Sequence, residues 1–266
     1  MHNKAISVVT INLNNAAGLE ATIRSVLKQQ YTALEFVVVD GDSTDGSKEV
    51  INKYADKIQQ LLSEKDPGIY HAMNKGLAMA SGDYVLFLNS GDTFYSTTAL
   101  QQLMDGGDNA DIVYGNLMVC EGASHYERVY PEKLSFSYFL MASLPHPATL
   151  VKKTLFNTVG VFFEDIKIAA DWAFFTLAIV RHNCSYKHVP VVVTNFDLEG
   201  ISSQESNLKF IEAERVIILQ KYFPLFLDDY AALALTRQQL AVAKKQLGYR
   251  VYRKVKNIVS IKKTKK

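Results

Sequence analysis

Two acidic loops in this sequence each follow a short apolar run. The run 36–39 leads directly into a loop that carries Asp40 and Asp42, and the run 84–88 leads into a loop that ends at Asp92. Carboxylate oxygens suit a divalent cation, and they accept hydrogen bonds from the hydroxyls of a nucleotide. In open α/β sheets, ligands bind beyond the carboxyl ends of the strands. The two loops therefore predict a nucleotide-sugar site, with Mn²⁺ or Mg²⁺, at one sheet edge.

Alternating strand and helix patterns must position these loops. This order is typical of an α/β fold with a mostly parallel central sheet flanked by helices. Strands are predicted at 6–13, 35–39, 58–62, 83–88, 112–114, 116–120 and 189–196. Helices are predicted at 18–30, 47–58, 70–80, 97–104, 171–181, 205–222 and from 227 onward.

Each acidic loop also has a plainer structural interpretation. Ser, Thr and Asp cap helices and Gly relaxes turns, which would account for residues 44–46, and residues 90–92 could form a turn before the next helix. An acid directly after a buried strand is costly unless something pairs with it. We therefore expect Asp40 to contact a base or ribose.

Length and composition are those of a single catalytic region with an extension. The chain has 266 residues and a formal net charge of +2. Two cysteines are too few for a disulfide scaffold, which favours a cytoplasmic location, and residues 5–13 are expected to form a strand rather than a secretion signal. We expect one domain over 1–225, with a nucleotide-sugar half at 1–115 and an acceptor half at 116–225, followed by a helical basic extension at 226–266.

The basic charge is concentrated at the C-terminus. Residues 244–266 hold ten Lys or Arg and no acid, whereas the remainder has 19 basic and 27 acidic residues. Apolar residues spaced along one side of this segment predict an amphipathic basic helix that contacts the inner face of the cell membrane peripherally. A solvated terminal helix is the alternative. Nucleic acid is not expected as a partner, because the basic charge is confined to one end.

Four ordered motifs carry a resemblance to a known family. They are VVDGDSTDG at 38–46, SEKDPGIYHAMNKG at 63–76, ASGDY at 80–84 and FLNSGD at 87–92. Together they resemble the family 2 glycosyltransferases, in particular the branch found in bacterial O-antigen and capsule assembly. The resemblance implies a GT-A fold, a nucleotide-sugar donor, a divalent cation and inversion at the anomeric carbon.

The resemblance also implies roles for particular residues. Asp40 matches the acid that contacts the base, and Asp92 matches the last acid of the Asp-x-Asp metal motif. The chain departs from that motif at Asn89 and Gly91, so it offers one strong metal ligand. The donor-binding residues expected by this resemblance are Thr10, Asn12, Asp40, Asp42, Glu64, Asp66, Asn74, Asn89, Ser90 and Gly91.

A later segment, IAADWAFF at 168–175, resembles the one that carries the catalytic base of the family, which assigns that role to Asp171. An acid favoured in the first turn of a helix is the alternative. His146, between two prolines, is expected near the metal or the acceptor, with a structural turn as the alternative. The loop 199–203 resembles a Gly-rich loop that closes over the donor, with a capped turn as the alternative.

The resemblance thus implies an inverting glycosyltransferase, and we expect its donor to be a UDP-hexose or a UDP-N-acetylhexosamine. The acceptor would be a hydroxyl of a glycan or a lipid-linked glycan in surface polysaccharide synthesis. A sugar nucleotidyltransferase is a rival, but the loop 12–18 has no basic residue to bind its phosphates. A non-catalytic scaffold that binds nucleotide sugars is a second rival, from a different class of protein.

Overall fold

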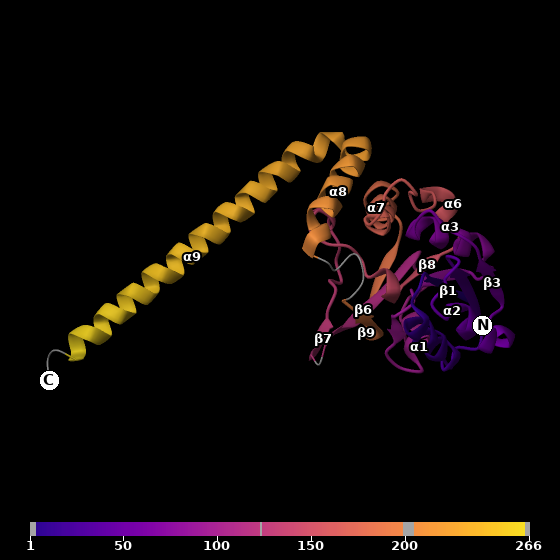
Figure 1. Ribbon diagram of the computed structural model, residues 1–266. Coiled ribbons are helices and arrows are strands. Elements are labelled where there is room, and N and C mark those ends of the chain that lie inside the picture. Colours follow the sequence, from indigo (N-terminus) through magenta and orange to yellow (C-terminus); the bar gives the residue numbers. More distant parts are fainter. Residues whose placement is uncertain (1–3, 123, 199–204, 264–266) are drawn as a thin grey trace. The chain divides into compact units, whose positions relative to one another are not determined.

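The computed structural model describes residues 4–122, 124–198 and 205–263, and within them one sheet of nine strands forms the centre of the first unit (Figure 1). The chain divides into two units, 1–215 and 216–266. The boundary expected at 225/226 stays a prediction. Among the described helices, none has the length and apolarity needed to cross a bilayer.

The first half of the sheet is parallel, as the sequence predicts. Its strands lie in the order β3-β2-β1-β4. The runs of Val, Ile and Phe in β1 and β2 are buried on both faces, which is typical of parallel strands covered by helices. Their bounds are β1 Ile6–Asn12, β2 Leu34–Asp40, β3 Gln60–Ser63 and β4 Tyr84–Phe87.

The second half of the sheet is mixed. It continues from β4 in the order β8-β6-β9-β5, and β7 pairs with β6; of these pairs only β6 and β9 run parallel. The sequence predicts neither β5, β7 nor β8. The bounds are β5 Thr93–Phe94, β6 Ile112–Glu121, β7 Ser124–Arg128, β8 Thr149–Lys152 and β9 Tyr186–Asp197.

The two strands predicted at 112–114 and 116–120 are one continuous strand in the structure. Residues 112–114 and 116–120 both belong to β6, whose pairing with β9 shifts register on either side of Asn116. Gly115 allows this irregularity, because a Cβ there would lie 2.5 Å from Val193 Cγ2 and 2.7 Å from the Val191 carbonyl oxygen. The break in the sequence pattern is therefore a bulge inside one strand.

Most predicted helices are present, but two of them end early. The helix predicted at 47–58 ends at Lys53 and is followed by the short turn η1. The helix predicted at 171–181 ends at Thr176 and continues as the π-helical segment η3, Leu177–Arg181. The short helices α5 and α6 were not predicted. The bounds are α1 Ala16–Leu27, α2 Ser47–Lys53, η1 Ala55–Lys57, α3 Ile69–Met79, α4 Ala99–Asp105, α5 Phe136–Phe139, η2 His146–Ala148, α6 Leu155–Val159, α7 Ala170–Thr176, η5 Glu205–Asn207, α8 Leu208–Tyr222, η6 Pro224–Phe226 and α9 Leu227–Lys263.

Helices cover both faces of the parallel half. On one face, apolar residues of α1, α2 and α4 join Val8 and Phe36 in a continuous core. On the other face, α3 lies so close to the sheet that a Cβ at Gly76 would stand 2.4 Å from Val9 Cγ1. Phe87 of β4 packs edge-on against Phe156 and Phe162 on this second face. The close contact fixes α3, which carries several of the candidate site residues.

Candidate active site

The ends of β1, β2 and β4 bring both acidic loops to one edge of the sheet. Asn12 and Asp40, the last residues of β1 and β2, are direct neighbours in the parallel register. The backbone N–H of Ser90 donates to the Ile11 carbonyl oxygen at 3.1 Å, so the loop after β4 runs beside the same strand end. The prediction that two strands deliver their loops to a shared edge is confirmed.

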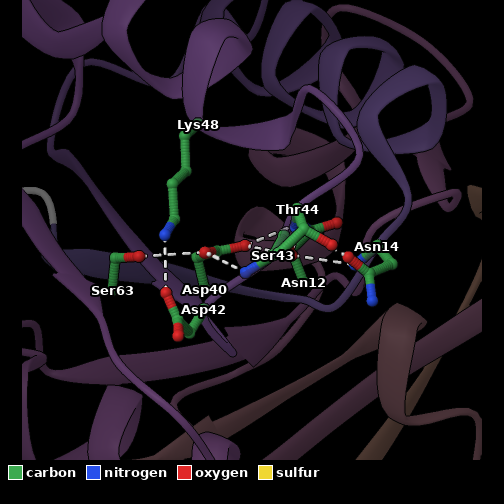
Figure 2. A network of polar contacts seen from close by, with 8 residues as sticks. All are labelled: Asn12, Asn14, Asp40, Asp42, Ser43, Thr44, Lys48 and Ser63. Atoms are coloured by element: carbon green, nitrogen blue, oxygen red, sulfur yellow. Dashed lines mark hydrogen bonds and ion pairs between the residues drawn. The ribbon is translucent and has the colours of Figure 1, made fainter.

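The carboxylate of Asp40 is fully enclosed by protein hydrogen bonds (Figure 2). Its Oδ1 accepts from Asn12 Nδ2 at 2.9 Å and Ser43 Oγ at 2.6 Å. Its Oδ2 accepts from the Ser43 N–H at 3.0 Å and Ser63 Oγ at 2.9 Å. Burial alone would raise the pKa of Asp40, but these hydrogen bonds outweigh it and lower the pKa. Asp40 thus fixes the loop 41–46, and its contact with a base stays a prediction.

The Asn12 side chain leaves one acceptor open at this edge. Asp40 orients the amide, because the Nδ2 group must face the carboxylate. Asn12 Oδ1 is buried and has no hydrogen-bond partner within the described part of the chain. An unpaired buried acceptor is costly, so this oxygen is a natural partner for an N–H group of a ligand.

Other predicted donor residues hold the protein together. Thr10 Oγ1 donates to the Leu88 carbonyl oxygen at 2.7 Å, joining β1 to the chain after β4. Asn74 Nδ2 donates to the Phe162 carbonyl oxygen at 2.9 Å, and Asn74 Oδ1 accepts from the Phe162 N–H at 3.0 Å. Asp42 forms an exposed ion pair with Lys48. The donor-binding roles predicted for Thr10, Asp42 and Asn74 stay untested.

A cluster of ion pairs on α3 holds Glu64 and Asp66. Lys75 Nζ lies 2.5 Å from Glu64 Oε1 and 2.7 Å from Asp66 Oδ1. His71 Nδ1 lies 2.9 Å from the same Asp66 oxygen. Asp66 Oδ2 is buried without a partner among the described residues. This Asp66 oxygen is open to a ligand, and the donor-binding roles predicted for Glu64 and Asp66 stay untested.

Among the buried acids in the described part of the chain, Asp92 is the one with the least compensation of its charge. Its side chain is 7% exposed, and Oδ1 accepts only a long hydrogen bond of 3.4 Å from the Asp197 N–H. Burial raises the pKa of Asp92 to about 7, although the charge of His146 and the Asp197 N–H act in the opposite direction. A nearby cation would stabilise the ionised form.

Asp171 lies in a buried pair with His146. His146 Nδ1 is 3.3 Å from Asp171 Oδ2, and the Tyr70 hydroxyl donates to Asp171 Oδ1 at 3.0 Å. Burial would raise the pKa of Asp171, but the hydrogen bond and charge of His146 outweigh it and lower the pKa. The pKa of His146 is raised, because its attraction to Asp171 and Asp92 outweighs burial. Asp171 is thus ionised at neutral pH.

His146 also links Asp171 to the second acidic loop. His146 Nε2 lies 3.4 Å from Asn89 Nδ2, and the charge of Asp92 acts on the imidazole. His146 therefore joins Asp171 to the loop of Asp92, and this loop runs beside the end of β1, the neighbour of Asp40. The roles predicted for the three acids stay untested.

The residues around Asp92 fit a divalent cation that has few protein ligands. The carboxylate of Asp92 lies near His146, and Asn89 Oδ1 is buried without a partner in the part of the chain that the structure describes. Mg²⁺-type sites often use one or two carboxylates, with substrate phosphates and water completing the shell. His146 could ligate through Nε2 while Asp171 orients its Nδ1–H, an arrangement typical of metal-bound histidines. No cluster of three or more His, Cys, Asp or Glu suited to a metal occurs in residues 4–122, 124–198 and 205–263.

Two contacts were missed by sequence reasoning. Tyr70 stands four residues before Asn74, and this spacing on one helix indicates that both face the segment 162–171. Glu214 accepts backbone hydrogen bonds just before Asp171. Its position between Ile211 and Ile218, at apolar helical spacing, was the available signal. The loop predicted at 199–203 lies outside the described residues.

Comparison with known proteins identifies the family. Residues 7–163 match the family described as Glycosyl transferase family 2. The chain belongs to this family. It is 31% identical over 227 residues to the uncharacterized glycosyltransferase MT1564 of Mycobacterium tuberculosis, covering 82% of this chain and 85% of the relative. It is 27% identical over 214 residues to a PGL/p-HBAD biosynthesis glycosyltransferase of Mycobacterium bovis, covering 77% and 82%.

Solved structures show the fold of this family 2 glycosyltransferase. S. aureus TarS 1-349 in complex with UDP-GlcNAc is similar with a TM-score of 0.64 at 20% identity, over 80% of this chain and 65% of that one. The mannosyltransferase PcManGT of Pyrobaculum calidifontis, in complex with GDP-Man and Mn²⁺, gives a TM-score of 0.56 at 18% identity, over 91% and 81%. The predicted GT-A fold and glycosyltransferase class are confirmed. The chain spans 60% of TarS 1-349 in its complex with UDP, less than two thirds of that structure.

Asp92→Asn should stabilise the ligand-free protein at pH 8. The pKa of Asp92 is about 7 in the folded protein, against 3.8 for the ordinary group. Ionisation of Asp92 therefore destabilises the folded protein progressively as the pH rises from about 4 to about 7, and the full cost is present at pH 8. The gain in melting temperature should therefore be larger at pH 8 than at pH 5. Asp56→Asn, at an exposed site, is the control. An equal or absent shift at both pH values would contradict this account of Asp92.

Proposed function

We propose that the chain is an inverting transferase that moves a sugar from a UDP-sugar to a hydroxyl of a glycan or lipid-linked glycan, in surface polysaccharide synthesis. The observation that carries the proposal is the pairing of Asp171 with His146 beside the loop of Asp92. This pairing supports a mechanism in which Asp171 accepts a proton and Asp92 acts on the diphosphate, both at the same sugar carbon. UDP-hexose and UDP-N-acetylhexosamine are the proposed donors.

Asn12 supports a pyrimidine or purine with a ring N–H as the base of the donor. Its Oδ1 is a buried acceptor that Asp40 holds in a fixed orientation. The N3–H of uracil would donate to it. The N1–H of guanine has the same polarity, so a binding comparison of UDP with GDP separates the two nucleotides. The UDP-GlcNAc complex of TarS, the more similar of the two folds, supports UDP.

The proposed chemistry is a single displacement. Asp171 accepts the proton of the acceptor hydroxyl while that oxygen bonds to C1 of the sugar. The bond between C1 and the diphosphate oxygen breaks, and its electron pair leaves with the diphosphate. The ionised state of Asp171, which follows from its lowered pKa, is the form that accepts a proton. A divalent cation held by Asp92, and by His146 if it ligates, would stabilise the charge on the departing diphosphate.

Asp171→Asn tests the catalytic role. The amide cannot accept the proton, so the transfer rate should fall by about 10²–10⁴-fold, while the Kd for UDP stays within about twofold. The measurement is UDP release from UDP-glucose and UDP-GlcNAc with a panel of glycan acceptors, together with calorimetric binding of UDP. Asp165→Asn, at an exposed residue six positions earlier, is the control.

Wild-type turnover in Asp171→Asn would remove this residue from the mechanism. If the unmodified protein binds UDP-sugars but releases no UDP with any acceptor, the non-catalytic scaffold is favoured instead.

A second test concerns the cation. If Asp92 holds Mn²⁺ against the diphosphate, then Mn²⁺ should raise the melting temperature more in the presence of UDP than alone, because a ligand that binds only the folded state stabilises it. Asp92→Asn should lose this joint effect, whereas Asp56→Asn should keep it. Chelation by EDTA should abolish it in the unmodified protein. A UDP shift that is the same with EDTA and Mn²⁺ would argue against a metal at this site.

We propose peripheral membrane contact through residues 244–266, whose helical backbone is described to Lys263. Ten basic residues and no acid would attract an anionic surface by about 1 kcal/mol for each charge near the lipid. The protein should sediment with phosphatidylglycerol vesicles and not with phosphatidylcholine vesicles. A chain that ends at residue 243 should stay in the supernatant with both. Equal sedimentation of the two chains would contradict the proposed contact.

A further inference from the structure

We propose that Glu214 is a positioning residue that holds the backbone segment 167–169 and thereby sets the place of Asp171. This inference rests on the proposed function, because it assumes that Asp171 is the base. Glu214 lies on α8, far along the chain from the acidic loops and beyond residues 7–163, which match the family. It belongs to the same unit as Asp171.

The contacts of Glu214 are unusual for a surface helix acid. Its side chain is buried, with 4% exposed. Oε1 accepts from the Lys167 N–H at 2.6 Å, and Oε2 accepts from the Ile168 and Ala169 N–H groups at 3.0 Å each. Three charge-assisted hydrogen bonds offset the cost of burying the carboxylate. The Glu214 carboxylate thus binds the N–H groups of three consecutive residues.

These peptide groups lead into α7, the helix that carries Asp171. The N-cap residue of α7 is Ala169, which has no side chain able to satisfy the first N–H groups of the helix. Glu214, from another helix, accepts from the N–H of this N-cap residue and from the N–H groups of the two residues before it, so it anchors the chain where it enters α7. Because Asp171 follows Ala169 by two residues, the direction of its side chain depends on how this first turn is anchored.

The same segment is also held by Tyr70 of α3 and by Arg215 of α8. The Tyr70 hydroxyl lies 2.5 Å from the Ile168 carbonyl oxygen and 3.0 Å from Asp171 Oδ1. Arg215, the neighbour of Glu214, lies over the ring of Trp172 at 5.1 Å from its centroid. The segment around Asp171 is therefore fixed between α3 and α8. A base must stand within hydrogen-bond reach of the acceptor hydroxyl, and a displacement of about 1 Å can lower the rate about 10²-fold.

Glu214→Gln tests the inference, because an amide presents one N–H₂ group to backbone donors that need an acceptor. We expect faster amide hydrogen exchange within 166–172 and unchanged exchange in β1 and β2. We expect kcat for UDP release from UDP-glucose or UDP-GlcNAc to fall about 10–100-fold, with the Kd for UDP within about twofold. Glu212→Gln, at an exposed residue of the same helix, should leave the amide exchange, kcat and the Kd for UDP unchanged.

A double-variant cycle separates positioning from general stability. If Glu214 acts through Asp171, adding Glu214→Gln to Asp171→Asn should leave the residual rate within about twofold, because the base is already absent. A further loss in that background, or unchanged exchange at 166–172, would overturn the inference. So would faster exchange with an unchanged kcat.

Failure of the inference differs from failure of the proposed function. Full turnover in Asp171→Asn would overturn the assignment of the base, whereas an inactive Asp171→Asn with a fully active Glu214→Gln would overturn only the role of Glu214. If Glu214→Gln yields no folded protein, Glu214→Asp keeps the charge and shortens the side chain by one methylene. A lowered kcat with unchanged UDP binding in that variant supports positioning, and an unchanged kcat contradicts it.

Discussion

The cost of burying carboxylates governs the arrangement of this site. The parallel strands are covered by helices on both faces, and the chain places buried acids at or just beyond their ends. Each ionised group must be compensated by hydrogen bonds or by charge. Asp40 is compensated by four protein hydrogen bonds, and Asp171 by His146 and Tyr70. Asp92 receives one long hydrogen bond, so burial dominates its pKa.

This difference in compensation gives Asp40 and Asp92 different roles in the protein. A carboxylate whose acceptors are already filled, such as Asp40, organises the protein around it and orients Asn12. A carboxylate left under-compensated, such as Asp92, gains most from an added positive charge. Strain of this kind is common at functional sites, where stability is given up for binding. Asp40 and Asp92 therefore differ in what a bound positive charge would add: little at Asp40, whose charge the protein already compensates, and more at Asp92.

The sequence predicts what local periodicity and strand ends determine. Apolar runs identify β1, β2 and β4, and parallel pairing requires their ends to meet, so the shared position of Asp40 and Asp92 follows. The strands of the mixed half of the sheet were harder to predict from the sequence. Strand β8 has four residues and pairs with β4, more than sixty positions earlier, through contacts that no local pattern encodes. The bulge at Gly115 interrupts the alternation of β6 and makes one strand resemble two.

The sequence could indicate which side chains share one helix or strand, but not which side chains meet from different helices or strands. His146 was placed near the metal or acceptor by resemblance, but its pairing with Asp171 depends on a three-dimensional approach of η2 and α7. Glu214 is farther still along the chain from the acidic loops, and its three hydrogen bonds join α8 to the start of α7. The residues that match the family end at 163, so they contain the donor edge but neither Asp171 nor Glu214. The proposed base and its proposed positioning residue therefore both lie beyond the part of the chain that matches the family model, where the family motifs give no guide to side-chain partners.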